Sequence, residues 1–374
     1  MEDRLKSLIE GNSEANRIRW AMEWKKQGKK VIGVLSSEVP EEVISAADML
    51  PFRITGTWQE NISHARVYRS ESSCAYCNHV LESLLAGELD FLDGIIIGDI
   101  DQDLVRLWDV ILALKIKPFC HIMHIPFVDS ELNYRYLSNE IRRLMSAVEV
   151  FGETKITDDS LRLSINTYNR MRDNLTSIYE LRKKETPPLS GAETLGITTT
   201  ATVMPKERFN QELEALLPYL EKRETDLDRT HPRLLVTSEM LDNPEYMELV
   251  EETCLVAMDD IDNGSRYFNL PVDTAREDPV NALARRYLNR HGAPRMAHWD
   301  RQAEQIIAWV KEFSIDGVLG LPLTWCHPQS YRMPFLSEKL KEAGIPSISL
   351  DRAYHLANIG QLRTRIGAFV EMLA

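Results

Sequence analysis

The sequence lacks the features that would place it in a membrane or on nucleic acid. No apolar run in its 374 residues approaches the roughly 20 residues that a helix needs to cross a bilayer. The opening stretch, MEDRLKSLIEGNSEANRIRW, is charged and helical in pattern, without the apolar centre of a signal peptide. The formal net charge of -13 argues against a nucleic-acid partner, which normally requires a basic face. We therefore expect a cytoplasmic protein that binds neither membranes nor nucleic acids.

Cysteine is scarce, with five residues in the whole chain. They are too few and too scattered for a disulfide framework, so we expect free thiols or metal ligands. One Cys-x-x-Cys pair occurs, Cys74 and Cys77, and no second pair accompanies it. A single pair argues against a closed zinc site made of four cysteines.

Several motifs of common enzyme classes are also missing. The sequence contains no GxGxxG and no GxxxxGK[ST] motif, and GAETLG at 191–196 does not have the pattern of a phosphate-binding loop. It contains no GxSxG elbow and no HExxH helix. We therefore expect that this chain does not itself hydrolyse a nucleotide.

What the sequence does contain is a regular alternation of short apolar runs with helical patterns. In the first third, KKVIGVLSS, PFRITG, GIIIG and PFCHIMHIP read as strands, and longer amphipathic stretches separate them. The same rhythm returns after residue 231, with strands expected at RLLVTS, CLVAMDD, DGVLGLPL and IPSISLD. This alternation favours parallel sheets with helices on both faces.

The two halves also share a pattern in which Asp-Gly precedes a strand, then a helix, then a strand led by proline. Between them no strand is expected, and long amphipathic patterns run to about residue 223. We therefore predict an α/β protein with two related, doubly wound parallel-sheet domains joined by a helical connector. The expected boundaries are 1–129 for the N-terminal domain, 130–230 for the connector and 231–374 for the C-terminal domain.

Polar side chains at the ends of the strands are the candidate catalytic residues, because open parallel sheets bind ligands at the carboxyl ends of their strands. Ser37 ends the first strand, His124 ends the fourth, and His327 stands beside a cysteine beyond the strand DGVLGLPL. His121 and His124 lie three apart in a strand and point to opposite faces, so at most one of them reaches a site.

Three cysteines are candidate ligands. Cys74 and Cys77 open a predicted helix, where thiolates could hold iron–sulfur or zinc, act as a redox pair, or pack as two buried thiols. A thioredoxin-type pair follows its strand directly, whereas RVYRSESS intervenes here. Cys326 follows a buried strand in LPLTWCHPQ and is a loop cysteine or a ligand at a domain interface. Cys120 and Cys254 have apolar neighbours, and we expect both to pack in the core.

Taken together, these segments resemble the benzoyl-CoA reductase and 2-hydroxyacyl-CoA dehydratase family. The resemblance covers nearly the whole chain, and it rests on the combination rather than on any one motif. Four stretches carry it: VIGVLSSEVPEEVISAADMLPFRITG, SCAYCNHVLESLLAGELDFLDGIIIG, DGVLGLPLTWCHPQSYRMPFLSEKLKEAGIPSISLD and IGQLRTRIGAFVEML.

The resemblance implies a heteromeric enzyme with iron–sulfur chemistry. Two paralogous catalytic subunits each carry a cluster, usually 4Fe-4S, and a separate ATP-dependent activator, supplied indirectly by ferredoxin, injects one low-potential electron. The enzyme then reduces an aromatic acyl-CoA ring, or forms a ketyl radical that eliminates water from a 2-hydroxyacyl-CoA. By the same resemblance, Cys74 and Cys326 match the first and last cluster ligands.

One position departs from the family pattern. The family commonly has a middle cysteine directly before an aspartate, after the GIII strand, and this chain has Ile100 before Asp101. Cys77 is the expected substitute thiolate, with Asp99, a sulfur ligand or water as alternatives. The cysteine segment favours a benzoyl-CoA-type reductase; the alternatives are a dehydratase subunit and a cluster-free structural partner subunit.

Overall fold

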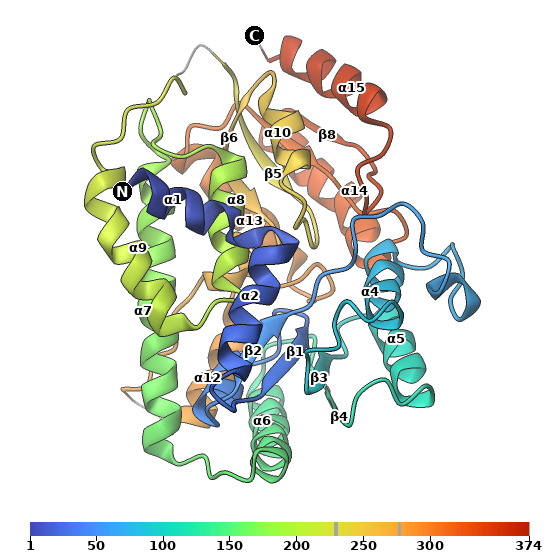
Figure 1. Cartoon of the computed structure of the whole chain (residues 1–374). Helices are drawn as coiled ribbons and strands as arrows, with labels where there is room; N and C mark the ends of the chain where they lie inside the picture. The colour runs from blue at the N-terminus through green and yellow to red at the C-terminus, as the bar shows by residue number, and fades with distance from the viewer. Residues whose placement is uncertain (228–230, 276–277, 374) are drawn as a thin grey trace.

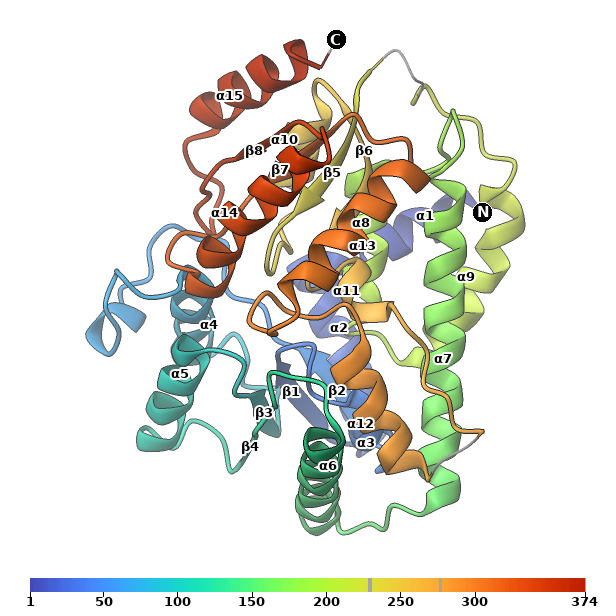
Figure 2. The ribbon, with the colours of Figure 1, turned by 180° about the vertical axis from the view of Figure 1, so that it is seen from behind.

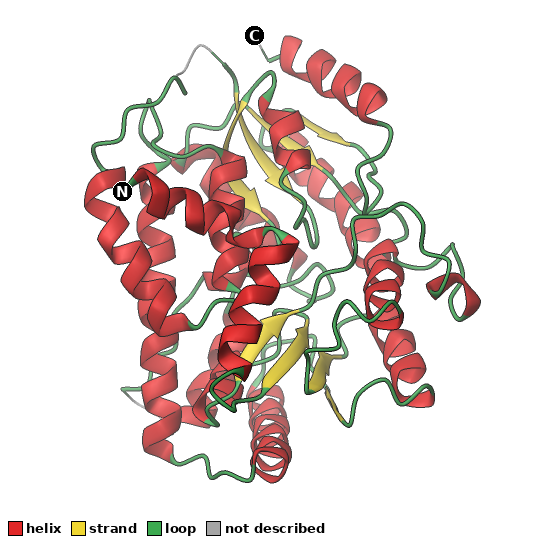
Figure 3. Ribbon diagram, viewed as in Figure 1, coloured by secondary structure: helices red, strands yellow, loops and turns green. Residues whose placement is uncertain are grey.

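The computed structural model describes residues 1–227, 231–275 and 278–373 of the chain. Two four-stranded parallel sheets lie one above the other in the view of Figure 3, each flanked by helices. The α/β class and the two related sheets predicted from the sequence are therefore confirmed. Within the described residues, no helix is both long enough and apolar enough to cross a bilayer.

The first sheet has the strand order β2-β1-β3-β4, and every neighbouring pair is parallel. One of its two inner strands, β3, is GIIIG, and the three isoleucines of this strand are fully buried because helices cover both faces of the sheet. Burial of each such side chain contributes about 1.5–3 kcal/mol. The strands are β1 (Val31–Leu35), β2 (Leu50–Arg53), β3 (Gly94–Gly98) and β4 (Phe119–Met123).

The second sheet repeats this topology, with the order β6-β5-β7-β8 and parallel pairing throughout. β5 corresponds to β1, and β7 corresponds to β3, in chain order and in position. This identity of strand order is the structural counterpart of the sequence repeat. The strands are β5 (Arg233–Thr237), β6 (Leu255–Asp260), β7 (Gly317–Gly320) and β8 (Ser347–Ser349).

Helices surround both sheets (Figure 1), and Figure 2 shows α12, α13 and α14 from the opposite side. The N-terminal part contains α1 (Glu2–Ile9), α2 (Glu14–Lys25), α3 (Glu41–Ala46), α4 (Ala75–Leu85) and α5 (Gln102–Ala113). The connector contains α6 (Glu131–Gly152), α7 (Asp158–Leu181), α8 (Gly191–Ala201) and α9 (Lys206–Leu220). The C-terminal part contains α10 (Glu245–Glu251), α11 (Ser265–Phe268), α12 (Pro279–Asn289), α13 (Trp299–Glu312), α14 (His327–Glu342) and α15 (Ile359–Glu371).

The connector helices pack against both halves of the chain. α7 contacts α3 of the first half, α6 contacts α12 of the second, and α8 packs on α1 and on β6. One apolar cluster consequently includes side chains from β1, from the connector and from β7. The predicted domain boundaries at residues 129 and 230 stay a proposal. The apolar core crosses both of them, so the core does not mark where one domain ends and the next begins.

Candidate functional site

A small cavity of about 40 Å³ lies where the carboxyl ends of the two sheets meet. Its lining residues follow several different strands, as expected for open parallel sheets. The remaining residues come from the first turns of α4 and α5. The lining residues are Ser36 after β1, Ile100 and Asp101 after β3, Glu239 and Met240 after β5, Asp262 after β6, Leu323 and Cys326 after β7, with Cys74, Tyr76 and Leu104.

Two cysteines from opposite halves of the chain face this cavity. Cys74 is the N-cap residue of α4, and Cys326 is the N-cap residue of α14. Both thiols are buried, with 5 % and 6 % of each residue exposed. All five cysteines are free. The structure therefore brings together two residues that stand 252 positions apart in the sequence, which places thiol chemistry at the junction of the halves.

Three helices begin at the cavity. Besides Cys74 and Cys326, Asp101 is the N-cap residue of α5, and its Oδ1 accepts the backbone N–H of Leu104 at 2.7 Å. A helix N-terminus carries a partial positive charge and favours anions within about one turn. The electrostatics of the three helix termini therefore favour anionic ligands or thiolates in the cavity.

Burial acts in the opposite sense on the thiols, because it disfavours the negatively charged thiolate form. Burial, together with the nearby Glu239 carboxylate, raises the pKa of Cys326 well above its usual value. A hydrogen bond with the Cys74 thiol, followed by burial, raises the pKa of Cys77 in the same way. A raised pKa favours the protonated form of both thiols, and a metal ion that bound them would displace these protons.

Cys77 occupies a different position from its neighbour in the motif. It is fully buried in the first turn of α4 and contacts Cys74, but it is not among the residues that line the cavity. Ile100, at the position where the resembling family commonly has a cysteine, does line the cavity and presents an apolar side chain. The wall of the cavity thus contains two thiols and one isoleucine.

The backbone is strained on both sides of the cavity. Ser36 has φ of 93° and Trp325 has φ of 64°, values that non-glycine residues rarely adopt. Gly98 lies against Ser36, where a Cβ would meet the serine Oγ at 2.6 Å. Strain of this kind costs about 1–3 kcal/mol per residue and tends to occur at functional sites.

Two polar atoms of the lining stand out because they have no hydrogen-bond partner within the described part of the chain. They are Oγ of Ser36 and Oε1 of Glu239, and both atoms are buried. The other oxygen of Glu239, Oε2, lies 3.5 Å from Nη1 of Arg266. Burial raises the pKa of Glu239 to about 7, although the Arg266 guanidinium lowers it.

Neither residue was among the candidates from the sequence. Glu239 closely follows the strand RLLVTS, so the rule of carboxyl-terminal strand ends could have found it. Ser36 stands next to the candidate Ser37, and only the backbone turn after β1 determines which of the two hydroxyls faces the cavity.

The three candidate catalytic residues lie outside the lining. The Ser37 hydroxyl donates to Oδ1 of Asp262 and accepts from Nη2 of Arg290 at 2.9 Å, so it joins the two halves. His124 contacts Oδ2 of Asp99 through Nδ1 at 2.8 Å. His327 is exposed in the first turn of α14, where its ring stacks on Tyr331. A catalytic role for any of them stays a prediction.

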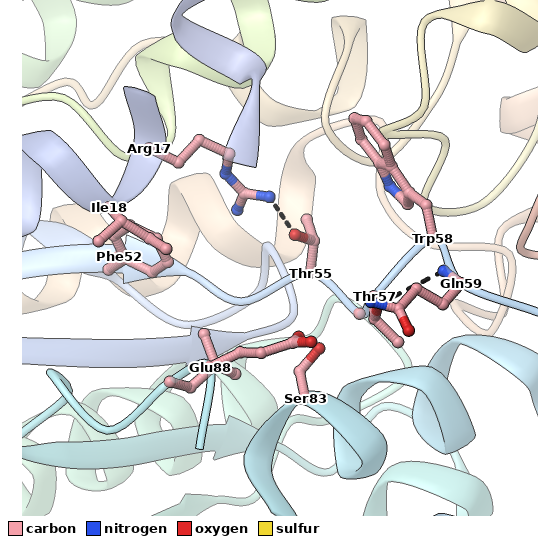
Figure 4. A pocket seen from close by; sticks show the side chains of 11 residues that line it. Arg17, Ile18, Phe52, Thr55, Thr57, Trp58, Gln59, Ser83 and Glu88 are labelled. Atoms are coloured by element: carbon pink, nitrogen blue, oxygen red, sulfur yellow. Dashed lines mark hydrogen bonds between the residues drawn. The ribbon is translucent and has the colours of Figure 1, made fainter. Parts of the chain in front are cut away.

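A second cavity, of about 280 Å³, lies between α2, the end of β2 and α4 (Figure 4). Arg17, Phe52, Thr55, Trp58 and Ser83 are among its lining residues, and no cysteine is. The Tyr76 hydroxyl belongs to a residue that lines the first cavity, and it donates to the Ile54 carbonyl at 2.8 Å. The segment that follows Ile54 lines the second cavity.

The thiol cavity does not by itself form a complete metal site. Across residues 1–227, 231–275 and 278–373, no three or more His, Cys, Asp or Glu side chains are grouped so that they could hold a metal ion. The donors that face the cavity are nevertheless of the kind that iron–sulfur clusters prefer, because thiolates are their usual ligands.

Comparison with known proteins identifies the family. Residues 36–373 match the model of the family described as 2-hydroxyglutaryl-CoA dehydratase, D-component. The chain belongs to this family. The match begins directly after β1 and runs through the connector and the second sheet, so it includes every residue that lines the thiol cavity.

Individual relatives are distant but cover the full length. One subunit of the benzoyl-CoA reductase of Thauera aromatica is 26 % identical, with 94 % of each chain covered. The (R)-phenyllactyl-CoA dehydratase beta subunit of Clostridium sporogenes is 25 % identical, with 92 % of each chain covered. The beta subunit of (R)-2-hydroxyglutaryl-CoA dehydratase of Acidaminococcus fermentans is 24 % identical, with 94 % of each chain covered. Reductase and dehydratase subunits of this family are thus about equally similar to the chain.

Proposed function

We propose that the chain is the iron–sulfur catalytic subunit of an ATP-dependent reductase that acts on an aromatic acyl-CoA, as the name of benzoyl-CoA reductase implies for its relative. One observation carries the proposal: two thiols from opposite halves of a family member face one buried cavity at three helix N-termini.

The proposed ligands of a cluster, most simply 4Fe-4S, are Cys74 and Cys326, with Cys77 behind Cys74 as the alternative thiolate. When bound, such a cluster supplies a low-potential electron carrier and an iron with a position open to an oxygen atom. Because the cavity measures about 40 Å³, binding requires lining side chains to move outward. Met240 is suited to this movement, since methionine is unbranched and flexible.

The surrounding side chains have two tasks under this proposal. Ile100, Leu104 and Leu323 are buried and exclude water, which strengthens every electrostatic interaction in the cavity. The unpartnered Ser36 hydroxyl is available to donate a hydrogen bond to an oxygen atom of the substrate. The helix N-termini stabilise negative charge that develops there.

The proposed partners follow from what the chain lacks. The sequence has no phosphate-binding loop, so a separate activator subunit is proposed to hydrolyse ATP and to receive its electrons from ferredoxin. A paralogous catalytic subunit is proposed as well, since each relative cited above is named as a subunit.

The second candidate function is that of a 2-hydroxyacyl-CoA dehydratase subunit. The chain is nearly as similar to the two dehydratase subunits as to the reductase subunit, so sequence identity supports the dehydratase function as much as the reductase function. A third candidate, a cluster-free structural partner, is suggested by Ile100 in the cavity wall.

An anaerobic assay tests these functions against one another. The purified complex, supplied with activator, ATP and a low-potential reductant, is given benzoyl-CoA or a 2-hydroxyacyl-CoA. The proposal predicts reduction of the aromatic ring. Elimination of water from the hydroxyacyl-CoA would instead establish the dehydratase function, and activity with no iron in this chain would establish the structural partner.

A further inference from the structure

The Cys-x-x-Cys motif contains a thiol that does not reach the cavity. Cys74 lines the thiol cavity, whereas Cys77 lies behind it, fully buried and outside the lining. Both cysteines are free. The motif therefore brings together two reduced sulfur atoms, of which one faces the cavity and the other faces only its neighbour and the core.

The start of α4 holds these two thiols in contact. Cys74 is the N-cap residue, and Cys77 lies in the first turn, where its thiol shares a hydrogen bond with that of Cys74. The N–H of Asn78 donates to the Cys74 carbonyl at 3.1 Å and closes this turn. Residues three apart on a helix have Cβ atoms about 5–6 Å apart, and a disulfide needs about 3.5–4.5 Å. The small difference falls on Cys74, whose ψ of 121° is not helical, so its adjustment does not unwind α4.

Solvent is closer to Cys74 than to Cys77. Figure 1 shows the segment between β2 and α4 extending from the side of the molecule. Residues 70–72 of this segment are exposed, and the two neighbours of Cys74, Ser73 and Ala75, are partly exposed. Cys74 itself is 5 % exposed, and Cys77 is 0 % exposed. A small oxidant therefore meets Cys74 first, with Cys77 directly behind it.

The other buried thiols are less suited as partners of Cys74. Cys326 faces the same cavity, but it is the N-cap residue of α14, so a link between these two would join opposite halves of the chain. Cys254 contacts the Val250 carbonyl at 3.0 Å and does not line the cavity. Cys77 lies in the same helical turn as Cys74 and is the thiol that is hydrogen-bonded to it.

We propose that Cys74 and Cys77 form a reversible disulfide when the chain meets a peroxide. The Cys74 sulfur attacks one oxygen of hydrogen peroxide, the O–O bond breaks, and a sulfenic acid and one water molecule form. The Cys77 sulfur then attacks the Cys74 sulfur, the S–O bond breaks, and a second water molecule leaves as the S–S bond forms. The two thiols lose two electrons and two protons, and the peroxide is reduced to two water molecules.

The disulfide would withdraw the Cys74 thiol from the cavity and so oppose the binding of a metal by that thiol. Because both sulfur atoms are buried, a large protein disulfide does not reach them, and the pair responds to a small oxidant rather than acting as a thioredoxin-type catalyst. The inference does not rest on the proposed function, because it concerns only sulfur atoms that the chain itself supplies.

The test uses the full chain, purified without oxygen in the presence of a metal chelator and then freed of reductant. After brief exposure to hydrogen peroxide, the free thiols are alkylated and the chain is cut with trypsin. Cys74 and Cys77 fall in one peptide, 70–106, whereas Cys326 falls in another, 312–332. Mass spectrometry therefore distinguishes a disulfide within the first peptide from a link between the two peptides.

The expected result is that peptide 70–106 loses two hydrogen atoms and takes up no alkyl group, and that dithiothreitol restores both thiols. Cys77→Ser should instead leave Cys74 as a sulfenic or sulfinic acid, because no second thiol reacts with the first product. Cys254→Ala is the matched control, since Cys254 is also buried and free, and it should form the disulfide as the parent does. Circular dichroism of each variant verifies that it is folded.

Three outcomes would overturn the proposal. Full alkylation of Cys74 and Cys77 after peroxide treatment would show that the pair is not oxidised. A link between peptides 70–106 and 312–332 would assign the disulfide to Cys326, and a sulfinic acid on Cys74 in the parent would show that Cys77 does not react with the first product. Each of these leaves the proposed function untouched, because failure of that function is measured as iron content and activity of the untreated protein.

Discussion

The Nη1 atom of Arg53 lies 3.0 Å from Oδ2 of Asp262, in an ion pair that joins the two halves of the chain and is buried on both sides. Burial alone would lower the pKa of Arg53, but the carboxylates of Asp262 and Glu41 outweigh it and raise that pKa. The Ser37 hydroxyl donates to the other oxygen of Asp262. This cluster fixes the second sheet against the first directly beside the thiol cavity.

Removal of the charge on Asp262 should destabilise the fold. Asp262→Asn is expected to lower the free energy of unfolding by about 3 kcal/mol, because an arginine is left partly uncompensated in a buried position. This expected loss of stability lies at the lower end of the usual range, because Oε1 of Glu41 still lies 3.2 Å from Nη2 of Arg53. Denaturant unfolding measures the change.

The control for this variant is an exposed pair. Arg106 and Asp109 lie 2.8 Å apart with more than half of each side chain exposed, so Asp109→Asn should change stability by less than about 1 kcal/mol. Equal effects of the two substitutions would mean that the buried pair does not hold the halves together.

Glu42 supplies a pH-dependent part of the stability. Burial would raise its pKa, but the guanidinium groups of Arg172 and Arg286 lower that pKa below the usual 4.5. A carboxyl group with a depressed folded-state pKa stabilises the fold above its unfolded pKa, and this contribution is lost as the pH falls through the folded pKa. The difference in stability between the parent and Glu42→Gln should therefore be full above about pH 4.5 and shrink below it.

Unfolding curves recorded between neutral and acid pH decide the matter. A difference between parent and Glu42→Gln that stays constant as the pH falls below 4.5 would show that the Glu42 carboxylate is not held in its charged form by Arg172.

Substitution by alanine should affect the free energy of unfolding differently at two adjacent serines. Ser36→Ala removes a buried hydroxyl that has no partner in the described residues, so the free energy of unfolding should rise or stay level, by up to about 1 kcal/mol. Ser37→Ala deprives Asp262 and Arg290 of a hydrogen-bond partner and should lower it by about 1–3 kcal/mol. Thermal unfolding of the pair measures this contrast.

The turnover of Ser36→Ala tests whether this hydroxyl also has a catalytic role. If the Ser36 hydroxyl contacts substrate, Ser36→Ala should lower turnover although the protein is as stable as the parent. Parent-like turnover in that variant would remove Ser36 from the site and leave its strained backbone without a catalytic explanation.

The sequence was a good guide to the strands, because parallel strands buried on both faces are short, apolar and β-branched. GIIIG and RLLVT are examples, and both were found where expected. The meeting of Cys74 with Cys326 also followed from the rule of strand ends, supported by a family resemblance. The roles of Ser36 and Ser37 could not be read in this way, since the positive φ of Ser36 breaks the alternation of side chains at the end of β1.

Glu239 was missed for a different reason. Glu239 stands out because its buried Oε1 atom has no hydrogen-bond partner in the described residues. Tertiary packing between the second sheet and the helices determines this, and the local sequence does not reveal it. Similarly, Cys77 belongs to an obvious motif, yet its helix turns the thiol behind Cys74 instead of into the cavity lining.

The central claim is that the cavity between the two sheets holds an iron–sulfur cluster on Cys74 and Cys326. The most direct test is iron and sulfide content, with visible absorption, of the anaerobically purified chain and of Cys74→Ser and Cys326→Ser. Cys120→Ala and Cys254→Ala are the controls, because these thiols contact the Lys117 and Val250 carbonyls and do not line the cavity. Both serine variants are expected to fold but lose the cluster, and both alanine variants are expected to keep it. Full iron in either serine variant would rule out that cysteine as a ligand.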